Sequence, residues 1–157
     1  MRLFHSPTSP YVRKVMVVLH ETGLLGLVQV IPATGNPVDP GSIPVDYNPL
    51  GKLPLLLRED GTAIYDSRVI TRYLDTRAGA GLYPESDGLW PVLTLEATAD
   101  GILDAALLVV YESRIRPAEK QFQPWSDGQL AKITRALDAI EARWLPVLHG
   151  TLNAAQI

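Results

Sequence analysis

The chain has 157 residues, of which 46% are hydrophobic and 20% charged, and its net charge is −3 at pH 7. This composition is typical of a folded protein and argues against disorder, while the acidic balance gives no reason to expect a nucleic-acid partner. The absence of cysteine excludes disulfides and a dithiol redox centre. No stretch reaches the roughly 20 apolar residues of a membrane span, and the start lacks the apolar run of a signal peptide. We therefore expect a cytoplasmic protein with no membrane partner.

The first half of the N-terminal region predicts a strand, a helix and a second strand. Residues 2–5 form a strand candidate, and a helix begins at Pro10, because proline is tolerated in the first turn. Apolar side chains then recur at helical spacing up to a stop near Gly23, namely Val12, Val15, Met16 and Leu19. Residues 28–31 predict the second strand, and the Pro- and Gly-rich residues 32–49 predict a long loop.

The following residues predict a hairpin and a helix. Residues 53–57 form an apolar strand, Asp60-Gly61 is a turn signal, and residues 62–65 form the return strand. Ser67 is expected to cap a helix with an apolar face of Val69, Ile70, Tyr73 and Leu74. The first 75 residues therefore predict the order β-α-β, loop, β-β-α.

The remainder predicts helices only. Residues 89–114 form a long helix, and Ser126 with Gln129 resembles a capping box that starts a second one. The apolar face of this second helix comprises Leu130, Ile133, Leu137, Ile140 and Trp144. Asn153 with Gln156 is a further capping pattern, one residue before the sequence stops. Because two helices cannot bury two wide apolar faces alone, we expect an incomplete helical part that exposes apolar surface.

Three motifs in this order resemble a soluble glutathione transferase of the bacterial serine type. They are S-P-T-S-P-Y-V-R-K from residue 6, N-P-L-G-K-L-P from residue 48 and I-Y-D-S-R-V-I from residue 64. The resemblance implies an α/β thioredoxin-like glutathione-binding domain at residues 1–75, a linker at 76–84 and a partial all-α domain at 85–157. It also implies that the C-terminal part of the helical domain is missing.

The implied activity is detoxification by joining the glutathione thiolate to small apolar electrophiles, with glutathione as co-substrate and no cofactor. The resemblance further implies a homodimer, in which Arg68 and Arg72 would face Asp100 and Asp104 across a two-fold axis; taken singly, such pairs are more often solvated surface charges. The three histidines have no ligand spacing, so no metal is assigned.

Ser9 and Thr8 precede the first helix. From the residues alone, Ser9 is an N-cap beside Pro10. The resemblance implies that its hydroxyl also donates to the glutathione sulfur, with Thr8 as the rival hydroxyl. Because a hydroxyl has one donor and two acceptor sites, the two roles are compatible.

Two further segments have both a structural and a functional interpretation. Leu53-Pro54 either opens a strand or, by resemblance, forms a cis peptide that turns the Leu53 backbone toward glutathione. From the residues alone, Asp66-Ser67 is a helix cap. The resemblance implies that Ser67 binds the γ-glutamyl carboxylate and Asp66 the α-ammonium. A glutamate is more usual than Asp66 in the family, so the side chain here is one methylene shorter. Lys52 either meets the glycine carboxylate or is simply solvated.

The electrophile pocket is assigned by analogy only, to Tyr11, Tyr111 and Arg114. Two other functions stay open. One is a non-catalytic glutathione-transferase-like binding or regulatory protein, and the other is a glutathione-dependent isomerase or peroxidase. A disulfide oxidoreductase is disfavoured because the chain has no thiol.

Overall fold

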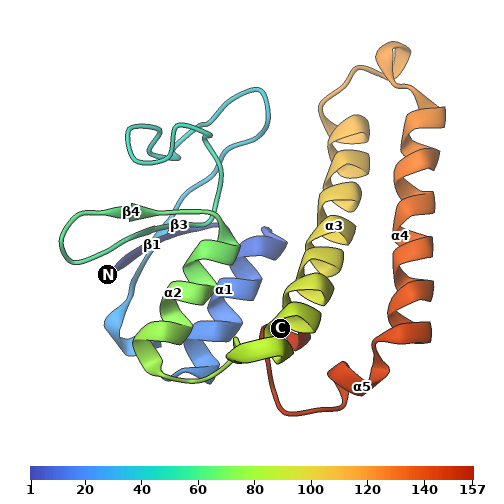
Figure 1. The fold of residues 1–157 in the computed structure, drawn as a ribbon. Coiled ribbons are helices and arrows are strands. Elements are labelled where there is room, and N and C mark those ends of the chain that lie inside the picture. The colour runs from blue at the N-terminus through green and yellow to red at the C-terminus, as the bar shows by residue number, and fades with distance from the viewer. The chain divides into compact units, whose positions relative to one another are not determined.

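The computed structural model describes residues 1–157 (Figure 1). The chain forms two compact units, of which the first comprises Met1–Leu82 with Ile157 and the second Tyr83–Gln156. The first unit is mixed α/β and the second contains helices only. None of the helices combines the length and apolarity that crossing a membrane requires.

A four-stranded sheet forms the centre of the first unit. Its strands are β1 (Arg2–His5), β2 (Gln29–Pro32), β3 (Leu55–Leu57) and β4 (Ala63–Ile64), arranged in the order β2-β1-β3-β4. β1 runs parallel to β2 and antiparallel to β3, and β4 is antiparallel to β3. The predicted β-α-β, loop, β-β-α order is confirmed. β3 begins only after Pro54, whose missing N–H cannot enter the ladder.

Helices α1 (Pro10–Glu21) and α2 (Ser67–Ala78) pack side by side (Figure 1). The predicted face of α1 is confirmed except at Met16, which is only half-buried. In α2, Ile70 and Leu74 are fully buried, but Val69 is 51% exposed, so the predicted four-residue face was too wide. Val69 precedes Ile70 by one residue, about 100° around the helix, which turns it to solvent.

The bounds of α2 also differ from the sequence prediction. Asp66, and not Ser67, is the N-cap, because its side chain accepts the backbone N–H of Arg68. At the other end the helix continues past residue 75 to Ala78. Gly79 then ends it with φ 62°, a left-handed conformation that glycine adopts without a Cβ clash.

The second unit is built on α3 (Leu89–Arg114) and α4 (Gln123–Arg143), which pack together as a helical pair (Figure 1). The predicted bounds of α3 are confirmed. The predicted capping box is wrong, because Ser126 and Gln129 lie inside α4 and are buried. Pro124 occupies the first turn, and the N-cap is Phe122, four residues before Ser126. A single-turn helix, α5 (Leu145–Leu148), follows.

The capping pattern at Asn153 and Gln156 forms as predicted. The Asn153 backbone N–H donates to the Gln156 side-chain oxygen at 2.7 Å, and the Ala155 N–H donates to the Asn153 side-chain oxygen at 3.0 Å. These reciprocal bonds satisfy two backbone donors and start the 3-10 turn Ala154–Gln156. Further 3-10 turns lie at Leu25–Leu27, Ser86–Gly88 and Ala118–Lys120.

Candidate functional site

The turn between β1 and α1 holds the two candidate hydroxyls. The Ser9 N–H donates to the Ser6 carbonyl at 3.1 Å, and the Thr8 hydroxyl lies 3.1 Å from that of Ser6. The Ser9 hydroxyl accepts the backbone N–H of Val12 at 3.3 Å and so caps α1. Because Ser9 acts as the acceptor in this bond, its own proton is left to donate elsewhere. Ser9 is half-buried, whereas Thr8 is exposed.

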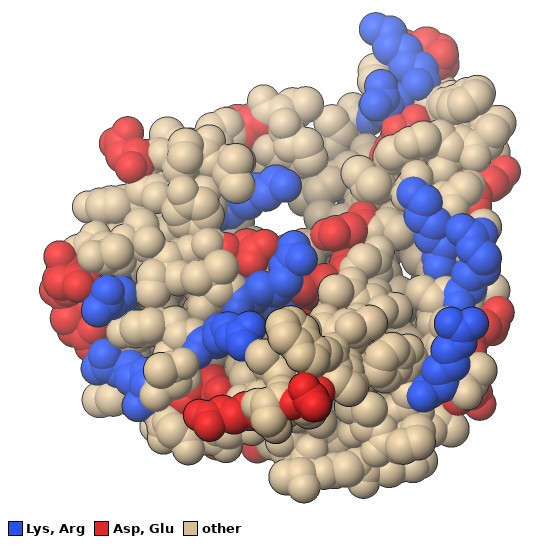
Figure 2. Space-filling model, in the orientation of Figure 1, with Lys and Arg blue, Asp and Glu red and all other residues tan.

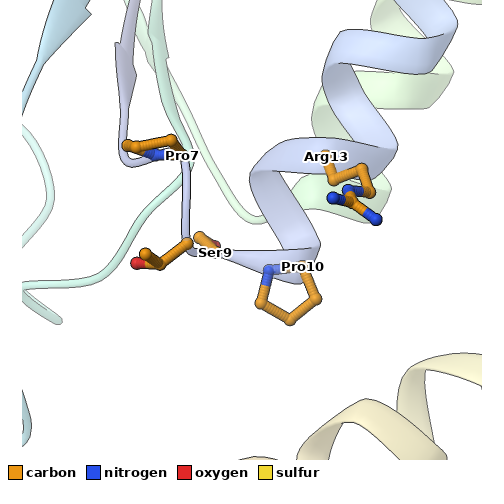
Figure 3. A pocket seen from close by; sticks show the side chains of 5 residues that line it. Pro7, Ser9, Pro10 and Arg13 are labelled. Atoms are coloured by element: carbon orange, nitrogen blue, oxygen red, sulfur yellow. The ribbon is translucent and has the colours of Figure 1, made fainter.

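A hollow of about 250 Å³ opens beside this turn and is lined by Pro7, Thr8, Ser9, Pro10 and Arg13. Figure 3 shows these side chains, which extend from the turn to the first part of α1. The hollow is large enough for a small group attached to a peptide thiol, but not for a whole tripeptide. Any larger ligand must therefore lie partly across the neighbouring surface.

The Leu53–Pro54 peptide bond is cis. The loop before it is organised by Asn48, which is 2% exposed. Its side-chain amide donates to the Lys52 carbonyl at 2.8 Å, while its side-chain oxygen accepts the Leu50 N–H at 3.1 Å. Asn48 therefore fixes the backbone that leads into Leu53-Pro54, whereas the Lys52 side chain projects into solvent.

Asp66 and Ser67 begin α2, after a cis peptide bond between Tyr65 and Asp66. One oxygen of the Asp66 carboxylate accepts the Arg68 N–H at 3.0 Å, and the other lies 3.3 Å from the Arg68 guanidinium. Ser67 is buried, with 2% exposure. The start of α2 thus combines the partial positive charge of a helix N-terminus with an exposed carboxylate.

The register of the sheet brings these three segments to the same end of the strands. Phe4 pairs with Leu55, so the end of β1, which leads to Ser9, lies beside the start of β3, which follows Pro54. Leu56 pairs with Ile64, so β4, which leads to Asp66, ends at the same end of the sheet. The loops that carry Ser9, Leu53-Pro54 and Asp66-Ser67 therefore leave the sheet at one end, and both helices begin there.

The opposite end of the first unit has a separate cluster of charges that pair with one another. The Arg77 guanidinium lies 2.9 Å from the Glu59 carboxylate and donates to the Tyr73 hydroxyl at 3.1 Å, while the Arg58 guanidinium lies 5.3 Å from the centre of the Tyr73 ring. A hydrogen bond from its own backbone N–H, and then the charge of Arg77, lower the pKa of Glu59. This cluster joins the hairpin to the last turn of α2 and lies away from the candidate site.

The residues predicted for an electrophile pocket lie in different units. Tyr11 is in the first turn of α1, whereas Tyr111 and Arg114 are in the last turn of α3. Tyr11 and Tyr111 are half-buried and Arg114 is exposed. A shared pocket for the three remains a prediction.

The charged side chains do not mark out a binding surface. Figure 2 shows acidic and basic side chains intermixed on the visible face, with no broad surface of one sign. No group of three or more His, Asp or Glu side chains is arranged to hold a metal ion.

Asn48 and Arg13 belong to the motifs quoted from the sequence, but no role was predicted for either. The signal for Asn48 was an asparagine between Tyr47 and Pro49, a setting in which its side chain commonly bonds the backbone two residues ahead. Arg13 carried no signal of its own, since it is one of several charged residues on a helix. Only the hollow beside Ser9 distinguishes it.

The fold places this chain among proteins that join an N-terminal thioredoxin-like domain to a helical domain. The family profile described as "Glutathione S-transferase, N-terminal domain" matches residues 8–77. The GST-like protein YibF of Escherichia coli K12, itself uncharacterised, is 38% identical over 156 residues, which is 98% of this chain and 73% of that protein. The chain therefore belongs to the glutathione S-transferase family.

Solved structures of a glutathione transferase family member from Pseudomonas fluorescens Pf-5 are also similar. The structure with bound glutathione is 47% identical with a TM-score of 0.95, and the match covers 99% of this chain and 77% of that one. The structure with bound S-(propanoic acid)-glutathione is 46% identical with a TM-score of 0.90, covering 99% and 76%. The thioredoxin-like and helical fold is therefore confirmed.

Proposed function

We propose that this protein binds glutathione at the end of the sheet where α1 and α2 begin, and joins the glutathione thiolate to small electrophiles with an apolar body. The observation that carries the proposal is the Ser9 cap, whose hydroxyl accepts from Val12 and keeps its proton for a ligand at the start of α1. The Pseudomonas relatives that bind glutathione and a glutathione conjugate support this choice of ligand.

Ser9 acts by favouring the thiolate. A free thiol has a pKa near 8.5, so only a few per cent is ionised at neutral pH. A donated hydrogen bond and the partial positive charge of the helix start both stabilise the anion. Lowering the thiol pKa by one unit corresponds to about 1.4 kcal/mol of stabilisation of the thiolate relative to the thiol.

The rest of glutathione is held by groups from the other two loops. The Leu53 backbone would pair with the cysteinyl residue as an added strand. Ser67 and the start of α2 would receive the γ-glutamyl carboxylate, and Asp66 the α-ammonium. The Asp66 carboxylate would bind the ammonium and Arg68 together, since a carboxylate offers about four acceptor positions. Lys52 would meet the glycine carboxylate.

The remaining parts of the proposal rest on the family. Tyr11, Tyr111 and Arg114 would line the electrophile pocket, and the protein would act as a cytoplasmic homodimer in detoxification. The conjugate bound by the Pseudomonas relative has a three-carbon acid on sulfur. A site of this family can therefore accommodate a small substituent at the thiol.

The test begins with the unmodified chain. Glutathione should raise its melting temperature, and an aryl halide should be conjugated in its presence. Binding without turnover of any electrophile would favour a non-catalytic regulator, whereas turnover of an isomerisable substrate or a peroxide alone would favour the other alternative. No binding at millimolar glutathione would overturn the proposal.

Ser9 variants then separate capping from chemistry. Ser9→Ala should lower turnover by about ten- to hundredfold, the value of a hydrogen bond to a charged group. Ser9→Asp keeps a capping oxygen but offers no proton, so it should retain the melting temperature while losing turnover. Thr8→Ala is the matched control. If Thr8→Ala loses turnover and Ser9→Ala does not, the role belongs to Thr8.

A further inference from the structure

Three arginines of the first unit pair with carboxylates, whereas the Arg13 side chain has no partner within the chain. Arg58 pairs with Asp60 at 3.4 Å, Arg68 with Asp66 and Arg77 with Glu59. Arg13 is exposed, and its guanidinium makes no ion pair or hydrogen bond within the chain. An unpaired guanidinium at the wall of a hollow has five donors ready for an anionic ligand.

Arg13 stands between two hollows. The first, of about 250 Å³, holds Ser9; the second, of about 210 Å³, includes Val12 and Met16. Pro7 and Arg13 line both, and no aspartate or glutamate lines either. The hollows therefore combine apolar walls with a single permanent positive charge. Figure 3 shows Arg13 projecting from α1 near Ser9 and Pro10.

The spacing between Ser9 and Arg13 sets the size of the ligand. The Arg13 N–H donates to the Ser9 carbonyl at 3.1 Å, so Arg13 follows Ser9 by one helical turn. Four residues rise about 6 Å along a helix. A sulfur held at Ser9 is thus within reach of a guanidinium through a bridge of only one or two carbons, since the arginine side chain is long and adjustable.

We propose that the preferred electrophiles carry a carboxylate one or two carbons from the attacked carbon, and that Arg13 binds this carboxylate. The inference rests on the proposed function. With a halogenated acid, the thiol proton passes to water and the thiolate sulfur forms a bond to the carbon. The carbon–halogen bond breaks and the halide leaves with the bonding pair. Arginine suits this role because its fork can meet a carboxylate with two hydrogen bonds.

The test compares chloroacetate with chloroacetamide, which match in shape and differ in charge. For each protein, kcat/KM is measured for both compounds, corrected for the uncatalysed reaction, and expressed as the acid-to-amide ratio. Any effect of Arg13 on the thiol itself cancels in this ratio. We expect Arg13→Gln to lower it about tenfold, the effect of losing roughly 1.4 kcal/mol. Arg13→Lys should recover part of the preference, and Arg135→Gln, on an exposed position of α4, should leave it unchanged.

A binding measurement gives a second result that needs no turnover. Calorimetry should show that S-carboxymethylglutathione binds more tightly than S-carbamoylmethylglutathione, and that Arg13→Gln removes this difference. An equal ratio and an equal affinity difference in the unmodified protein and Arg13→Gln would overturn the role of Arg13 while glutathione still binds. Failure to bind glutathione at all would overturn the proposed function and this inference together.

Discussion

The two units differ in how completely they bury their apolar side chains. In the first unit, all three residues of β3 are fully buried, and so are Ile70 and Leu74 of α2. The first unit also has seven large apolar side chains that are more than a third exposed, but four of them lie in the loop between β2 and β3, namely Val38, Val45, Tyr47 and Leu50. In the second unit, most of the large apolar side chains that are more than a third exposed lie on the helices. Those of the second unit are Trp90, Leu108, Val110, Phe122, Trp125, Leu130, Leu137, Leu145 and Leu152. The α/β unit has a closed core, whereas the helical unit keeps apolar faces open, as predicted from the sequence.

The difference follows from geometry. Two helices packed side by side can cover a whole face of a small sheet, but a pair of helices packed only on each other buries only the stripe along which they touch. α4 shows this directly, because Leu130 and Leu137, seven residues apart on one face, are 48% and 53% exposed. Rigid support for a ligand should therefore come from the first unit.

The sharpest test of this comparison is Leu56→Ala. Leu56 is fully buried and pairs with Leu3 and Ile64 across the sheet. Removing its side chain should lower the free energy of unfolding by about 2–5 kcal/mol, through lost burial and the cavity left behind. Urea unfolding with an unchanged slope would measure it. A loss below about 1 kcal/mol would show that the core is not closed.

A second test concerns the loop that leads into Leu53-Pro54, which Asn48 holds in place. Asn48→Ala removes two hydrogen bonds of a buried side chain and should cost about 1–3 kcal/mol. Glutathione binding should weaken as well, because the Lys52 backbone loses its anchor. Asn36→Ala is the matched control, since the Asn36 side chain also makes two hydrogen bonds to the backbone of this loop but is exposed. Equal effects of both variants would contradict a special role for Asn48.

In the second unit, polar contacts should matter where apolar burial is poor. The Phe122 backbone N–H at 2.9 Å, and then Arg116 at 2.8 Å, lower the pKa of Glu112. A carboxyl whose pKa is lowered by folding stabilises the fold above its ordinary pKa, and this contribution disappears as the pH falls through the lowered value.

Glu112→Gln should therefore lower the melting temperature at pH 7, and the difference from the unmodified protein should shrink in acid. Thermal unfolding from pH 7 to pH 3 would measure it. Glu119→Gln, in the exposed 3-10 turn between α3 and α4, is the control. A difference for Glu112→Gln that stays constant across this range would exclude the charge as its cause.

The smallest effect is expected for Leu137→Ala. This leucine is 53% exposed, so its removal should change the free energy of unfolding by no more than about 0.5 kcal/mol. The same urea measurement as for Leu56→Ala gives the direct contrast between the units. A loss of several kcal/mol would show that the face of α4 is covered in solution.

The fold was largely predictable because its strongest elements carry local signals. The bounds of α3 followed from a long apolar pattern, and the start of α1 followed from Pro10. The start of α4 was misjudged because Ser126 and Gln129 match a capping pattern but are buried inside the helix. Burial of polar side chains depends on neighbouring elements, and a local pattern does not contain that information.

The candidate site was predictable where a local motif marks it. Ser9 was predicted as an N-cap and acts as one, and the cis peptide that the resemblance implied at Leu53-Pro54 is present, whereas the cap of α2 is Asp66 and not Ser67. Asn48 and Arg13 escaped, because the first depends on the packing of an irregular loop and the second on a hollow formed by tertiary structure. The roles of Ser9, Asp66 and Ser67 toward glutathione stay predictions.

Helices α1 and α2 begin at the same end of the sheet, and this has a consequence for how the first unit responds to salt. β1 and β4 both run antiparallel to β3, and each is followed by a helix, so the two packed helices point the same way. Their like-charged ends are neighbours and repel one another. Mobile ions screen such repulsion, with a Debye length of about 10 Å at 0.1 M. Raising the ionic strength should therefore weaken the repulsion between these two helix ends even before any ligand arrives.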